Sequence, residues 1–128
     1  MNKIKTIIIS LSFLVAAAYG GDSKIISMVK KGSFLACAGY TIEELVNAYM
    51  EKVEWKHIVD KNGFDYVNIS GFTASGRPAN IFIQFWVRNN GEIGVQTIKI
   101  DGKVQKPGDI KNIIIAMCLI PLIEDEDE

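Results

Sequence analysis

Residues 79 to 88 read Ala-Asn-Ile-Phe-Ile-Gln-Phe-Trp-Val-Arg, and from Ile81 onward two kinds of side chain alternate. Successive side chains of a β-strand point to opposite faces, so this alternation sorts them into two sets. We predict that the first set faces a hydrophobic core and that the second faces solvent or a partner. The first set is Ile81, Ile83, Phe85 and Val87, and the second is Phe82, Gln84, Trp86 and Arg88.

Further strands are predicted on both sides of this stretch. Trp55, His57 and Val59 alternate with polar or smaller residues before Asn62-Gly63, a pair favoured in tight two-residue hairpin turns. Short turns rich in Gly, Asn, Asp and Pro separate the other strands. Consecutive strands joined by short turns predict a four-stranded antiparallel meander. The predicted strands are 54–60, 64–74, 79–88 and 92–100.

Three helices are predicted around these strands. Thr41 and Glu44 form a capping box, in which each side chain bonds the other residue's backbone N–H. Asp109 is the predicted N-cap of the last helix, and Pro121 is expected to stop it. The predicted helices are 23–31, 42–53 and 110–120.

The element order predicts an α+β fold, with two N-terminal helices and one C-terminal helix packed on one face of the sheet. The chain has 128 residues, of which 48% are hydrophobic and 23% charged, and this excludes a multidomain enzyme. The 14 Lys and Arg nearly balance the 15 Asp and Glu, so nucleic acid is not an expected partner. Residues 21–123 are predicted to form a single domain.

Residues 1–20 have the pattern of a secretory signal peptide. Lys3 and Lys5 precede the apolar run 7–18, and Ala18 and Gly20 suit cleavage after position 20. The apolar run is shorter than the roughly 20 residues of a membrane-spanning helix, so we expect no stable membrane insertion after cleavage. An uncleaved anchor is the alternative. A periplasmic or secreted location follows.

Cys37 and Cys118 are the two cysteines of the chain. An even number of cysteines in an exported protein favours a disulfide. The bridge would close a loop of about 80 residues and stabilise the fold by about 3 to 5 kcal/mol. Two buried, reduced cysteines are the alternative. With His57 far away, the pair lacks the ligand spacing of a zinc site, so we expect no metal.

The last five residues, 124–128, alternate Glu and Asp. They form an acidic tail beyond the predicted domain, and a solvated end of the chain is the expected role over a docking element.

The uncovered face of the sheet is the candidate functional site. Aromatic side chains beside a glutamine and an arginine are typical of recognition surfaces. If the second strand buries Val67 and Ile69, its alternate residues, Ser70 among them, join this face. The alternative is that the C-terminal helix, a loop or curvature of the sheet covers the aromatics. The candidate binding residues are Tyr66, Asn68, Phe82, Gln84, Trp86 and Arg88.

Signals for catalysis are weak, so we expect no enzyme. His57 is the one histidine, and no nucleophile elbow accompanies it. Asp60 and Asp65 flank a predicted turn, where turn chemistry alone favours aspartate. No glycine-rich loop leads into a helix that would hold phosphate, and we expect no cofactor.

Several of these segments resemble a poorly characterised group of small exported bacterial domains, often lipoproteins. The resemblance covers about residues 39–117. That group is similar in layout to the β-lactamase-inhibitor-protein-like fold, whose helix-backed sheet presents an open face to other proteins. The matching positions are Thr41-Ile42-Glu43-Glu44, Trp55, 60–63, 67–71, Ile83-Gln84-Phe85 and 98–105.

Together these patterns predict a small secreted or periplasmic module that binds an envelope protein through its open sheet face. The alternatives are a small envelope enzyme, a carrier of an apolar ligand and a purely structural envelope component. An enzyme would require His57, Asp60 and a serine to converge in one pocket. A carrier would require the sheet to curl around an apolar cavity.

Overall fold

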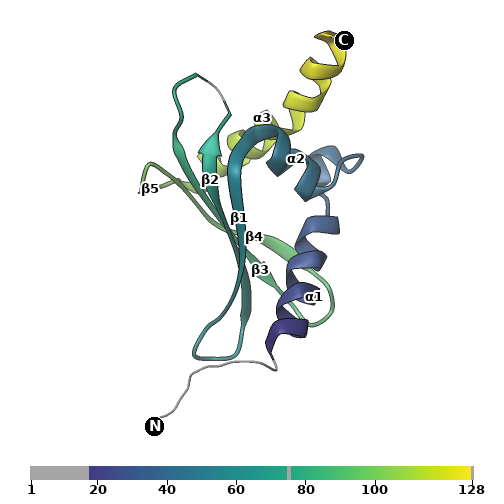
Figure 1. The fold of residues 1–128 in the computed structure, drawn as a ribbon, viewed down its shortest axis with the longest axis vertical. Helices are drawn as coiled ribbons and strands as arrows, with labels where there is room; N and C mark the ends of the chain where they lie inside the picture. Colours follow the sequence, from purple (N-terminus) through teal and green to yellow (C-terminus); the bar gives the residue numbers. More distant parts are fainter. Residues whose placement is uncertain (1–17, 75, 128) are drawn as a thin grey trace.

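The computed structural model describes residues 18–74 and 76–127, with side chains over 24–74 and 76–120. Most of the predicted signal peptide therefore lies outside the described residues, and residues 18–20 form the start of the first helix. Figure 1 shows the helices on one side of a twisted sheet. The elements are α1 (Ala18–Lys31), the 3-10 helix η1 (Leu35–Cys37), α2 (Ile42–Tyr49), β1 (Met50–Val59), β2 (Asp65–Thr73), β3 (Asn80–Val87), β4 (Ile93–Ile100), β5 (Lys103–Val104) and α3 (Pro107–Asp127).

The strands form one antiparallel sheet in the order β1-β2-β3-β4-β5. The predicted α+β fold and meander are confirmed, but the sheet has five strands and not four. Asp101 and Gly102 have φ angles of 51° and 82°, which are typical of a two-residue hairpin turn. This turn pairs Lys103 with Ile100 and so creates β5.

The hydrophobic core lies between the sheet and the helices. Phe85, the largest fully buried side chain, is 1% exposed, and its ring centroid lies 6.0 Å from that of Phe34. The predicted inward set of β3 is confirmed, as is the burial of Val67 and Ile69 on β2. Leu45 of α2 is also completely buried.

The helices do not all pack on the sheet as predicted. α1 and α2 contact the strands, whereas α3 packs mainly against α2 and η1. Figure 1 shows α3 running past α2 and away from the sheet. Met117 and Cys118 of α3 are nevertheless buried at the edge of the core. Therefore α1 and α2 form the layer that covers the sheet, and α3 packs against α2 and η1.

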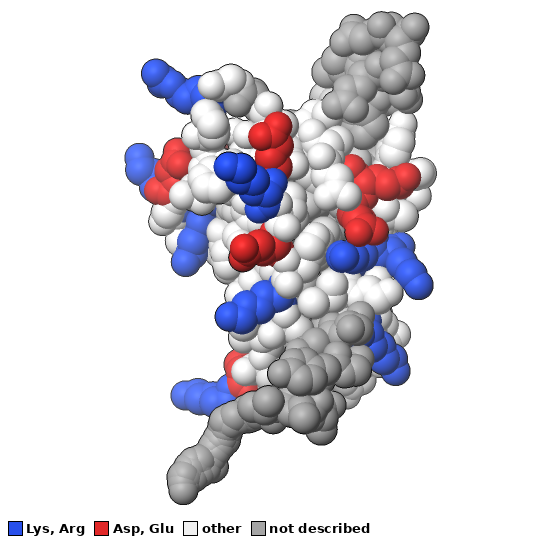
Figure 2. Space-filling view, in the orientation of Figure 1, with Lys and Arg blue, Asp and Glu red and all other residues white. Residues whose placement is uncertain are grey.

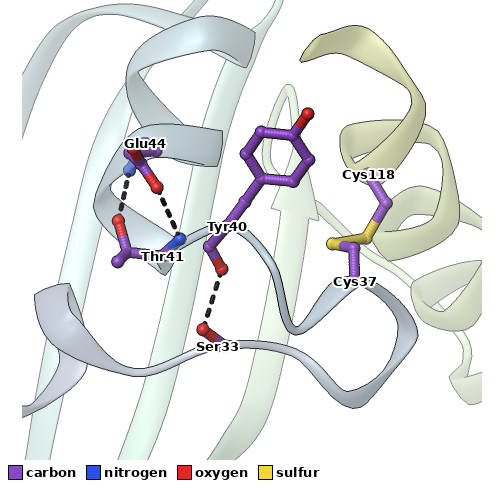
Figure 3. The surroundings of a disulfide bond; sticks show 6 residues. All are labelled: Ser33, Cys37, Tyr40, Thr41, Glu44 and Cys118. Atoms are coloured by element: carbon purple, nitrogen blue, oxygen red, sulfur yellow. Dashed lines mark hydrogen bonds between the residues drawn. A yellow bond between two sulfur atoms is a disulfide. The ribbon is translucent and has the colours of Figure 1, made fainter. Parts of the chain in front are cut away.

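The predicted disulfide between Cys37 and Cys118 is confirmed. It joins η1 to α3, two segments that are 81 residues apart, with a Cα–Cα distance of 5.8 Å that is normal for disulfides. Figure 3 shows this bond beside the start of α2. The bond therefore fastens the helix that has few contacts with the sheet.

The capping box of α2 is also confirmed. The Glu44 N–H donates to Thr41 Oγ1 at 3.1 Å, and the Thr41 N–H donates to Glu44 Oε1 at 2.8 Å (Figure 3). However, α2 ends at Tyr49 and not near Val53, because the chain becomes extended at Met50 and pairs there with Thr73 of β2. Strand pairing overrides the helical pattern.

The limits of the other two helices also differ from the prediction. α1 begins five residues before Ser23. α3 begins at Pro107, a residue favoured at the first helical position, so Asp109 lies in the first turn and is not the N-cap. The helix continues past Pro121, because a proline removes one backbone hydrogen bond but need not end a helix.

Candidate binding surface

The sheet surface opposite the helices, which we call the open face, carries the predicted outward set. Cross-strand pairing of β2 with β3 places Tyr66 beside Trp86 and Asn68 beside Gln84. All four side chains are partly exposed, whereas the hydrophobic residues that alternate with them, Val67, Ile69, Ile83, Phe85 and Val87, are buried. Ser70 and Phe82 form the next pair. The structure thus brings the candidate residues of both strands together, with Arg88 directly after β3.

Trp86 is fixed on the open face by two neighbours. It pairs with Gly94 of β4, and its indole lies so close that a Cβ atom at position 94 would overlap the ring. The Arg88 guanidinium carbon lies 4.4 Å from the ring centroid, and Arg88 Nη1 lies 3.3 Å from Glu92 Oε1. An aromatic side chain laid over a strand glycine is a known way to stabilise a sheet.

Phe82 also has a cation beside its ring. Lys99 of β4 pairs with Phe82, and the Lys99 ammonium lies 5.4 Å from the Phe82 ring centroid. Between these aromatic ends of the face, Gln84 Nε2 donates a hydrogen bond of 2.8 Å to Asn68 Oδ1. The face therefore has two cation–aromatic pairs separated by an amide pair.

A groove of about 640 Å³ lies at the end of the open face where the β1–β2 and β3–β4 loops meet. Phe64, at the edge of this groove, is 62% exposed. The groove combines aromatic walls with amide and guanidinium groups. Its lining residues are Asn62, Gly63, Phe64, Asp65, Tyr66, Trp86, Val87, Arg88, Asn89 and Gln96.

The two loops beside the groove are closed by the same backbone hydrogen bonds, and each also has a side chain that accepts from backbone N–H groups. In the first, the Asp60 carboxylate accepts bonds from the Asn62 and Phe64 N–H groups, and Gly63 has a φ of 84°. The predicted two-residue Asn-Gly turn is therefore wrong. The connection spans residues 60–64, and only its glycine needs positive φ. In the second loop, Asn90 Oδ1 accepts from the Glu92 N–H.

His57 and Asp65 form a pair outside the open face. His57 Nε2 lies 2.7 Å from Asp65 Oδ1, and the His57 side chain is only 8% exposed. The register places His57 beside the buried Val67, on the surface that the helices cover. The Asp60 carboxylate accepts hydrogen bonds from two N–H groups of its own turn.

Several further residues contribute to the open face and were not among the predicted ones. Ile58 pairs with Tyr66, and Phe72, which is 39% exposed, extends the face along β2. The sequence could have identified Ile58 and Phe72, because both continue the alternation of side chains along their own strands, β1 and β2. Lys99 and Gly94 required the register between β3 and β4, which alternation alone does not supply.

Other site types find little support in the described part of the chain. Among those residues, no group of three or more His, Cys, Asp or Glu side chains is placed to hold a metal ion. The helices of the same ranges include none that is long and apolar enough to cross a membrane.

Comparisons with protein-family models, with curated proteins and with solved structures each found no match. The resemblance to small exported bacterial domains therefore stays a prediction.

Proposed function

We propose that this protein is a small exported module that binds an envelope protein through its open face. The observation that carries the proposal is the position of the Trp86 side chain on the open face. It is partly exposed, and it contacts Gly94 and Arg88. Tryptophan, tyrosine and arginine dominate the binding energy of protein interfaces. All three occur together at this end of the sheet.

The fixed position of Trp86 favours binding for an energetic reason. A side chain that is free before binding loses about 0.5 to 1.5 kcal/mol of conformational entropy when an interface immobilises it. Trp86 is already held between the backbone of Gly94 and the Arg88 guanidinium. A partner that covers the indole therefore gains contact area at a low entropic cost.

The disulfide supports an extracytoplasmic location for this activity. Structural disulfides form and persist in oxidising compartments and are rare in the cytosol. The Cys37–Cys118 bond agrees with the predicted signal peptide, and together they favour a periplasmic or secreted protein. The proposed partner is accordingly a protein of the same compartment.

The two alternative functions have weaker support. The His57–Asp65 pair is the observation that favours an envelope enzyme, whereas the Asp60 carboxylate accepts a hydrogen bond within its own turn. A carrier of an apolar ligand would need an enclosed cavity, and the groove is a surface feature lined partly by Asn62 and Gln96. Protein binding therefore fits the geometry best.

An affinity pull-down from envelope extract tests the proposal. The bait proteins are the intact chain, Trp86→Ala, and Ile115→Ala as a control that removes an exposed apolar side chain from α3. We expect the intact protein and the control to retain the same partner. Loss of an interface anchor costs about 2 kcal/mol or more, which is at least about a thirtyfold loss of affinity for Trp86→Ala. Equal recovery by all three baits would contradict the proposal.

A further inference from the structure

The two edges of the sheet differ in how they are protected against pairing with another chain. β1 carries Glu51, Lys52, Glu54 and Lys56, and Figure 2 shows acidic and basic side chains in turn along the line that β1 follows in Figure 1. Lys52 also has a positive φ of 55°, at a shift in the β1–β2 register. Charges and bulges are the usual devices that protect an edge strand.

The opposite edge lacks most of this protection. β5 pairs with β4 only at Lys99 and Ile100. Residues 93–97, Ile-Gly-Val-Gln-Thr, contain no charged side chain and have no strand beside them on the outer side within residues 76–127. An uncharged edge of this kind is a template for an added strand.

The register shows which backbone groups this edge presents. The Arg88 N–H donates to the Glu92 oxygen at 2.9 Å, and the Gly91 N–H donates to the Arg88 oxygen at 3.0 Å, so Arg88 stands at a hydrogen-bonded position of the ladder. Because bonded and non-bonded pairs alternate in antiparallel strands, Gly94 also bonds toward β3, and the N–H and C=O groups of Ile93 and Val95 point outward. On the same outer side, the Gln105 N–H donates to the Ile98 oxygen at 2.9 Å. The open stretch ends at Gln96, where the β3–β4 register shifts.

We infer that an extended segment of a protein partner adds to β4 as a further strand beside Ile93–Val95. This inference rests on the proposed function and specifies how the partner binds. The segment lies antiparallel to β4 and in line with β5. Its side chain opposite Gly94 projects over the open face, where it packs against the fixed indole of Trp86. This mode of recognition, in which a peptide extends a sheet, uses backbone bonds for affinity and alternate side chains for specificity.

Charge indicates the chemistry of the next position in the added segment. Consider the residue of the added segment that comes two positions before the one opposite Gly94. Its side chain again projects over the open face and lies near Thr97, which precedes Lys99 by two residues on the same face of β4. The Lys99 ammonium lies over Phe82 and is paired with no carboxylate among the described side chains. The segment therefore carries an acidic residue there and an aromatic or large aliphatic residue opposite Gly94.

Selection of short random peptides displayed on phage tests this inference on the intact, disulfide-bonded chain. We expect the selected peptides to carry an acidic residue two positions before an apolar one. In NMR titrations with a synthetic copy, shift changes should cluster at residues 93–97 and at the Trp86 indole, and the Val95 N–H should become protected from exchange. A copy N-methylated at alternate backbone nitrogens should lose at least about tenfold in affinity because it cannot donate to β4.

A matched pair of variants makes the same test from the protein side. Val95→Pro removes an outward N–H that makes no hydrogen bond within the sheet, and edge strands tolerate proline at such positions. Val95→Ala removes side-chain contacts and keeps the N–H. Val95→Pro should weaken the synthetic peptide at least about tenfold and Val95→Ala less than about threefold. Thermal melts show whether Val95→Pro folds. If this variant does not fold, the affinity of the N-methylated peptide for the intact protein decides whether the segment adds as a strand.

The added strand would be overturned by a selection without binders, by equal affinity of the N-methylated peptide, or by shift changes centred on β1. Peptides that bind at Trp86 without protecting the Val95 N–H would also overturn it, but they would leave the proposed function standing. The proposed function fails separately, if Trp86→Ala retains the envelope partner in the pull-down.

Discussion

Phe85 and Trp86 are neighbours in the chain, yet the two faces of β3 give them different environments. Phe85 is 1% exposed and packs under the helices, whereas Trp86 lies partly exposed over Gly94 on a face that none of the described helices covers. Stability should depend mainly on the first face and binding on the second. This comparison shows that the size of an aromatic side chain does not decide its role, because the layer beside it does.

The largest expected effect tests the buried face. Phe85→Ala should lower the free energy of unfolding by about 3 to 5 kcal/mol, because it removes a fully buried ring and leaves a cavity. Trp86→Ala should cost only about 1 kcal/mol, since the indole lies at the surface and its removal leaves no enclosed cavity. Thermal or denaturant unfolding of both variants measures the difference. Equal losses would mean that both faces are buried and that the open face does not exist.

The disulfide offers a second test, confined to the helix side. Replacing Cys37 and Cys118 together by serine should destabilise the fold by about 3 to 5 kcal/mol, because the unfolded chain regains the freedom of a long loop. Since the bond joins η1 to α3, peptide binding at 25 °C should change little while the variant remains folded. Loss of peptide affinity in a folded variant would show that the two faces are coupled.

Gly94→Ala sharpens the comparison from the open face. A methyl group at position 94 meets the Trp86 ring, so the indole must move. We expect a loss of about 1 kcal/mol in stability and a change in indole fluorescence. In the Trp86→Ala background the same substitution should be nearly neutral. Equal costs in both backgrounds, measured by a double-mutant cycle, would show that the indole does not lie over Gly94 in solution.

The smallest expected effect concerns Tyr49 at the end of α2. Burial raises the pKa of its phenol above the ordinary value of 10.0. The folded state therefore keeps the proton at a pH where the unfolded chain has lost it. Its contribution to stability is complete below pH 10 and falls as the pH rises from 10 through the folded pKa. Denaturant unfolding of the intact chain and of Tyr49→Phe should show a steeper alkaline loss for the intact chain.

Local patterns in the sequence determined much of the fold. The period of two assigned residues 81–87 of β3 to the correct face, because the pleat of a strand enforces that period wherever one face is buried. Thr41 and Glu44 identified the start of α2, because a capping box depends only on residues within one turn. The disulfide was predictable because the chain has two cysteines and a predicted export signal, and neither observation requires knowing where the cysteines lie in the fold.

Only the tertiary structure decided the features that depend on distant residues. The pairing of Met50 with Thr73 ended α2 early, and the turn at Asp101-Gly102 folded β5 back onto β4. The contact of Trp86 with Gly94, eight positions later, required a register that contains a shift. The open edge of β4 likewise follows from where β5 stops. Sequence alternation fixes which way a side chain points, but only pairing between strands fixes what lies beside it, because register depends on contacts that no local pattern contains.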